Sequence, residues 1–232
     1  MLIYTFTSIG IYYLYNYIDN NNIFNKNNNN KSILTKEYRI VNKTKAYILV
    51  MLSPLSILYI YSILIGQPIT NFYLSNFIGS IYASTDMSAM FYNNKTHIST
   101  WMHHITVQLL YVYCYLNKFD MHTSLSQPIC VYCCFSSLAY LVNYRLSIRD
   151  SAKSKDTKGK NIELIINNIS FIIYFVTCIV NWVLQINYLL DTENIYRNYE
   201  KYIYFLILVM IIHDDIYLMK YLVNYNNKIV NK

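Results

Sequence analysis

Charged residues, glycine and proline are all scarce in this sequence. Charged residues make up 13% of the 232 positions and hydrophobic residues 55%, and the mean hydropathy is +0.21. This balance is typical of membrane proteins and excludes an ordinary soluble domain. With four glycines and three prolines, the chain contains no glycine-rich phosphate loop, nucleophile elbow or Walker motif.

Cysteine is also sparse, and its five positions do not form a disulfide framework. Cys130, Cys133 and Cys134 lie in an apolar run without a second cysteine pair nearby, so we expect them to pack between helices. The abundance of Tyr and Asn reflects AT-rich codon usage. The asparagine-rich segment 20–31 is therefore interpreted as a solvated low-complexity loop.

Long apolar runs are plentiful, and a helix needs about 20 such residues to cross a ~30 Å hydrocarbon core. Seven runs predict an all-α, polytopic membrane helix bundle with about seven transmembrane helices. They are Leu2–Ile18, Ala46–Gly66, Phe72–Tyr92, Ile98–Leu116, Ser124–Tyr144, Ile162–Leu190 and Tyr202–Val223. The expected divisions are a retained anchor at 1–18, a basic asparagine-rich cytosolic loop at 19–45, the main bundle at 46–228 and a cytosolic tail at 229–232.

Lysine and arginine concentrate in alternate loops, chiefly 19–45 and 145–160. Cytosolic loops carry this excess, so we expect the N-terminus outside or in the lumen and the C-terminus in the cytosol. The net charge of +7 then suits anionic leaflet lipids, and no nucleic-acid partner is indicated. The sequons at Asn42 and Asn94 would lie on the cytosolic side and stay unglycosylated.

Three ionisable residues interrupt the third and fourth apolar runs: Asp86, His103 and His104. An ionisable group at membrane depth costs several kcal/mol unless it faces a bundle interior or a cavity, so these are candidate functional residues. His104 shares a helical face with Gln108, while His103 points about 100° away. A zinc site that includes His213 is conceivable, but adjacent helical histidines diverge, so we predict no metal.

Polar residues also recur in the last two runs. In Ile162–Leu190 they fall three or four residues apart on one face, which indicates either interhelical hydrogen bonds or the wall of a polar cavity. They are Asn167, Ser170, Tyr174, Thr177, Asn181 and Gln185. In Tyr202–Val223 the consecutive residues His213, Asp214 and Asp215 sweep most of the helix circumference, so at least one must face protein.

Tyr82, Asp86, His103 and His104 resemble the Y-x-x-x-D … H-H arrangement of the TLC-domain family. Asn143-Tyr-Arg145 is similar to the N-x-R that ends a later helix in its non-synthase members. The resemblance implies transmembrane helices around a lipid-accepting cavity, usually in the endoplasmic reticulum or a related endomembrane. The lipid-cavity residues we expect are Tyr82, Gln108, Asn143, Arg145, Asn181, Gln185, His213 and Asp214.

Departures from the family pattern argue against ceramide synthesis. The synthases carry H-H-x-x-T, whereas here Thr106 comes one residue early, and the region after this run offers only Asp120 where they have two aspartates. The resemblance is therefore closer to the non-synthase members.

Three hypotheses follow, none with a cofactor. The protein binds or redistributes membrane lipids, or it is an acyltransferase that uses acyl-CoA, or its polar residues serve only structure and partner binding. In the acyltransferase, His104 or His103 would act as general base and Asp86 would orient the imidazole. That role requires Asp86 within hydrogen-bond distance of one of the two histidines.

Overall fold

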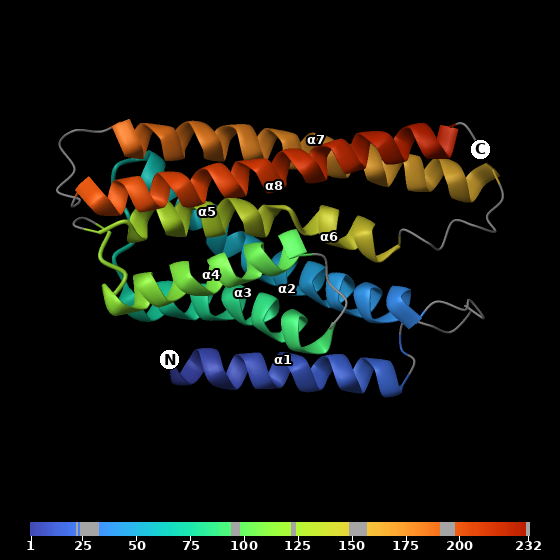
Figure 1. The fold of residues 1–232 in the computed structure, drawn as a ribbon, viewed down its shortest axis with the longest axis horizontal. Helices are drawn as coiled ribbons and strands as arrows, with labels where there is room; N and C mark the ends of the chain where they lie inside the picture. Colours follow the sequence, from blue (N-terminus) through green and yellow to red (C-terminus); the bar gives the residue numbers. More distant parts are fainter. Residues whose placement is uncertain are drawn as a thin grey trace.

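The computed structural model describes residues 1–21, 23, 33–93, 98–121, 124–148, 157–190 and 198–230, which form a bundle of eight helices (Figure 1). These are α1 (Leu2–Asn20), α2 (Ile33–Leu64), α3 (Phe72–Tyr92), α4 (Ile98–Leu116), α5 (Ser126–Leu138), α6 (Tyr140–Ser147), α7 (Thr157–Leu190) and α8 (Asn198–Val230). The expected all-α helix bundle is confirmed.

Most expected helices are present, and α3 and α4 have the expected ends. The expected loop at 19–45 needs correction because α2 already begins at Ile33, which makes residues 33–45 helical. Val41 and Thr44 are buried there, so packing against the bundle stabilises this extra helix. At the other end, α8 runs to Val230 and includes two residues of the expected tail. The asparagine-rich residues 24–31 lie outside the described residues.

The fifth expected helix is broken. α5 and α6 meet at Ala139 with a bend of 44°, within the segment expected to be one straight span, Ser124–Tyr144. No proline or glycine lies at the break. Because α2 packs along both α5 and α6, contact with α2 supports the two halves on either side of the bend.

Within the described ranges, three helical segments are long and apolar enough to cross a membrane: Lys36–Leu64, Asn161–Leu190 and Tyr199–Asn224. The bent pair α5–α6 makes a fourth if it counts as one span. This count, below the expected seven, leaves out α1, α3 and α4. α3 has a low hydropathy because many of its residues are polar. These polar residues are buried, among them Ser75, Asn76, Ser80, Ser84, Thr85, Asp86 and Ser88.

The arrangement places α3, the helix with the most buried polar side chains, inside the bundle. α1 lies at one edge against α3, and α7 and α8 lie side by side at the opposite edge, with α2, α5 and α6 between them (Figure 1). The outer faces of α7 and α8 expose large apolar side chains, such as Ile172 at 59% and Leu206 at 64%. Apolar side chains on the outer surface suit contact with lipid tails.

Candidate functional site

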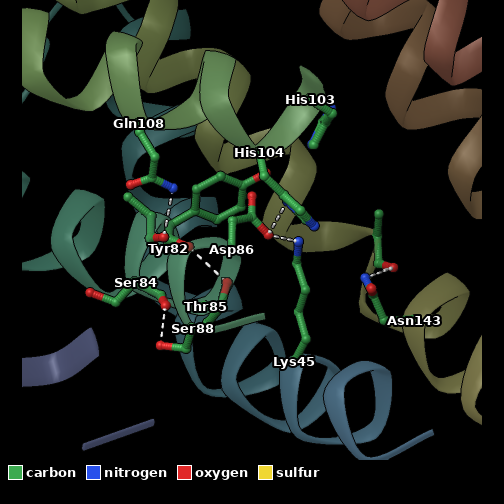
Figure 2. A network of polar contacts seen from close by, with 12 residues as sticks. Lys45, Tyr82, Ser84, Thr85, Asp86, Ser88, His103, His104, Gln108 and Asn143 are labelled. Carbon is green, nitrogen blue, oxygen red and sulfur yellow. Dashed lines mark hydrogen bonds and ion pairs between the residues drawn. The ribbon is translucent and has the colours of Figure 1, made fainter. Parts of the chain in front are cut away.

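Asp86 is the centre of the main charged cluster. Its side chain on α3 is fully buried, and Oδ1 forms an ion pair and a hydrogen bond with the Lys45 ammonium from α2 (Figure 2). His104 on α4 places Nδ1 3.2 Å from the same oxygen. One carboxylate therefore contacts side chains from two other helices, and a histidine lies within the distance of Asp86 that we required, although His104 Nδ1 does not have the geometry of a hydrogen bond.

Lys45 is the member of this cluster that sequence reasoning missed. Counted as a loop lysine, it instead lies in α2, and its side chain is only 13% exposed. Its ammonium lies 5.8 Å from the centre of the Tyr82 ring, one helical turn before Asp86. The available signal was the helix-compatible sequence leading into the apolar run at Ala46, since a helix extended backward brings Lys45 to the bundle.

The two adjacent histidines lie closer together than expected. Their ring centres are 5.8 Å apart, and donor atoms of Asp86, His103 and His104 lie within 4.8 Å of one another, a spacing compatible with a metal site. The Lys45 ammonium already neutralises Asp86, so a further cation at that carboxylate would be repelled. The expectation that the two histidines diverge is therefore wrong. The positive charge of Lys45 nevertheless disfavours a metal ion at Asp86.

A polar cavity of about 120 Å³ adjoins this cluster. Its lining includes Lys45, His103, Asp214 and Asp215, together with Asn143 and Asn181. His103 Nδ1 lies 3.5 Å from Asp214 Oδ2, which links α4 to α8. We had expected His104 to face the cavity, but His103 lines it, while His104 packs against Asp86.

Of the three consecutive polar residues on α8, Asp215 is the most buried, at 7% exposed. It accepts hydrogen bonds from Tyr174 Oη at 2.7 Å and Trp182 Nε1 at 3.0 Å, both on α7. Asp214 lines the cavity as expected, but His213 is exposed, which contradicts its expected place there. Helix rotation explains the difference, because burial of Asp215 turns His213 outward.

The polar stripe on α7 faces the bundle, as its spacing predicted. Gln185 donates to the Pro128 carbonyl at 2.9 Å and to Asn181 Oδ1 at 3.0 Å, and it accepts from Tyr204 Oη at 2.7 Å. Both readings of the stripe therefore hold in part: Asn181 lines the cavity, whereas Gln185 connects α5, α7 and α8 by hydrogen bonds.

Arg145 and Gln108 were expected to line the cavity, but each is engaged elsewhere. Arg145 is buried, pairs with Glu163 at 3.0 Å and donates from Nε to Asn167 Oδ1 at 2.9 Å. Gln108 donates to the Ala83 carbonyl at 3.1 Å and accepts from Tyr4 Oη at 2.6 Å. Sequence reasoning missed Glu163 because it stands at the start of the expected span. These contacts hold helices together outside the cavity.

A second pocket, of about 50 Å³, is apolar and is lined by residues such as Ile78, Val107 and Ile129. Tyr82 and Tyr132 line both pockets, so the two spaces adjoin at these residues. Tyr82, which we expected at a lipid cavity, thus lies where the polar and apolar spaces adjoin. Cys130, Cys133 and Cys134 line the apolar pocket, in keeping with the packing role predicted for them.

Comparison of the chain with protein-family models, with curated proteins and with solved structures found no match in any of the three.

Proposed function

We propose that this is a multi-pass membrane protein of TLC type that binds or redistributes lipid and so adjusts membrane lipid composition. The observation that carries the proposal is the pair of adjoining pockets, one lined in part by charged and polar side chains and the other wholly apolar. The polar one holds Lys45, His103, Asn143 and Asp214, and the apolar one shares its aromatic walls. An amphiphile divides in the same way between headgroup and tail.

The volumes decide which part of a lipid each pocket takes. An apolar cavity of about 150 Å³ is enough to bind benzene. At about 120 Å³, the polar cavity therefore matches a headgroup fragment and is far too small for an acyl chain. The apolar pocket, at about 50 Å³, takes a few methylene groups, and the rest of the chain would stay among the tails of the bilayer.

Seven spans remain our proposed topology. α1, α3 and α4 have 19, 21 and 19 residues, and at 1.5 Å per residue each is about 30 Å long. The buried polar side chains of α3 lower its mean hydropathy without contacting lipid. Together with the loop charges, this supports a lumenal or outside N-terminus and a cytosolic C-terminus, while an endoplasmic reticulum or related membrane is proposed from the TLC resemblance alone.

The Asn42 sequon, however, is a poor reporter of this topology. Asn42 lies within α2, is buried and donates a hydrogen bond to the Tyr38 carbonyl. A glycan is sterically excluded there on either side of the membrane. A reporter fused to each terminus is the suitable measurement.

Acyl transfer is the second candidate, because each histidine faces a carboxylate. His104 Nδ1 lies 3.2 Å from Asp86, and His103 Nδ1 lies 3.5 Å from Asp214. A neutral imidazole would take the proton of an amine or hydroxyl as that group attacks a thioester. The new C–N or C–O bond would replace the C–S bond, and the thiol would leave with a proton. His103 is the better placed base because it lines the cavity.

Lipid analysis distinguishes these functions. Membranes expressing the wild type are expected to differ in lipid composition from membranes with the His103→Ala/His104→Ala variant at equal abundance. His213→Ala is the matched control. It also removes a histidine of the helix bundle, but the side chain of His213, on α8, is exposed. We expect the purified wild type and the control to retain a bound lipid and the double variant to lose most of it.

Three outcomes separate the hypotheses. A new acylated lipid that forms only with wild type and control, when acyl-CoA is supplied, would support the acyltransferase. Lipid bound without any product would support the binding protein. Equal composition and no bound lipid in all three proteins would contradict both and leave the polar residues with a structural role.

A further inference from the structure

The polar cavity has an excess of negative charge. Among the described residues that line it, Lys45 is the lysine, and its ammonium is paired with Asp86, while Asp214 and Asp215 also line the cavity. This makes one ammonium against three carboxylates, an excess of two negative charges when the histidines are neutral. A buried charge without compensation costs several kcal/mol at membrane depth, so the cavity favours an additional cation.

Protonation of the histidines would compensate the charge only in part. Two imidazolium rings with centres 5.8 Å apart would repel each other, and His104 would also be repelled by Lys45 across the shared Asp86 oxygen. His103 faces Asp214 and can neutralise at most that carboxylate. Asp215 would remain, with two hydrogen bonds but without a cationic partner among the described residues that line the cavity.

Aromatic rings form much of the remaining wall. Tyr82, Tyr132, Tyr174 and Phe135 all line the cavity. The face of an aromatic ring attracts an ammonium, and cages of such rings recognise quaternary ammonium ligands. The Lys45 ammonium, 5.8 Å from the centre of the Tyr82 ring, already uses one ring in this way.

We propose that the cavity binds an organic ammonium group. The carboxylates of Asp214 and Asp215 would neutralise it, and Tyr132, Tyr174 and Phe135 would contact its alkyl substituents. Its source is either the headgroup of a zwitterionic phospholipid or a free quaternary ammonium compound such as choline. This inference rests on the proposed lipid-binding function and adds the chemical class of the headgroup.

The test uses the full-length protein purified in detergent and a comparison of bound lipids by native mass spectrometry. Phosphatidylcholine and phosphatidylglycerol with identical acyl chains are the probes, because only the former carries an ammonium group. We expect the wild type to retain phosphatidylcholine about tenfold more strongly. Asp214→Asn and Asp214→Asn/Asp215→Asn should abolish the preference, because Asn keeps the size of the side chain and removes its charge.

Glu200→Gln is the matched control. It neutralises another carboxylate of α8, one that accepts a hydrogen bond from Tyr113 Oη, a bond that an amide oxygen also accepts. The preference should persist in this variant. Thermal unfolding of every variant verifies folding, and Asp214→Asn alone, at a side chain that is 34% exposed in the parent, provides a mild substitution.

Competition with free choline identifies the source. Displacement of phosphatidylcholine by choline, or choline binding alone, supports an ammonium site if the Asp214→Asn variant loses it. Equal retention of both phospholipids without choline binding would overturn the ammonium site and leave the lipid-binding proposal intact. Absence of any bound lipid or choline would overturn both.

Discussion

Replacing Lys45 with methionine is expected to lower the free energy of unfolding by about 3–5 kcal/mol, because it leaves the buried Asp86 carboxylate without its cation. Asp86 is fully buried, so bulk water does not solvate its carboxylate in place of the ammonium. Methionine keeps most of the length of the lysine side chain, which limits the effect of lost packing. The measurement is chemical or thermal unfolding of the purified protein in detergent.

Two further variants isolate the charge effect. Lys45→Met/Asp86→Asn removes both charges and should recover much of the lost stability. Lys36→Met is the matched control: Lys36 also lies on α2 and pairs with an aspartate, Asp19, but its side chain is 36% exposed. Such partly exposed pairs contribute about 0–1 kcal/mol. Equal destabilisation by Lys45→Met and Lys36→Met would contradict a special role for the Asp86 cluster.

Replacing Arg145 with methionine is expected to have a similar effect, about 3–5 kcal/mol, since it leaves the Glu163 carboxylate buried without its cation. The side chains of Arg145 and Glu163 are 2% and 1% exposed, and Asn167 also accepts from Arg145 Nε. Arg145→Lys should recover only part of this stability, because the lysine ammonium cannot reproduce the planar contacts of the guanidinium. Unfolding in detergent measures all of these changes.

The role of Arg145 also predicts what should not change. Because Arg145 connects α6 to α7 outside the polar cavity, the folded fraction of Arg145→Lys should keep its headgroup preference. The double variant Arg145→Met/Glu163→Gln should be more stable than Arg145→Met. A loss of lipid binding in a fully folded Arg145→Lys protein would instead place this residue in the lipid site, as the sequence had suggested.

Apolar runs predicted where most helices lie, but neither the early start of α2 at Ile33 nor the bend at Ala139 was predictable. α3 and α4 have sharply defined ends because polar loop residues bound each apolar run. No proline or glycine marks the break between α5 and α6 in the sequence. The break depends on packing against α2, which is a tertiary effect. A single sequence contains no direct signal for such contacts.

The candidate site was predictable to the extent that helical periodicity determines it. Asp86 and His104 are rare ionisable residues in apolar runs, which marked them as candidates, but the sequence left open whether Asp86 reaches either histidine. Lys45 was not predicted as a member of the site, because charge counting assigns lysines beside an apolar run to the loop. The outward position of His213 depends on the rotation of α8, which is fixed by the bonds of Asp215 to α7.

The most direct test of the two-pocket account is photo-crosslinking with a phosphatidylcholine that carries a diazirine on one acyl chain close to its glycerol ester, among the few methylene groups that the apolar pocket can take. The account predicts labelling of buried residues of the apolar pocket, Ile78 on α3 and Ile129 on α5, which are 5% and 7% exposed. Excess unlabelled phosphatidylcholine should suppress this labelling. Crosslinks confined to outward-facing residues, such as Ile172 on α7 and Leu206 on α8, would contradict a lipid bound inside the bundle.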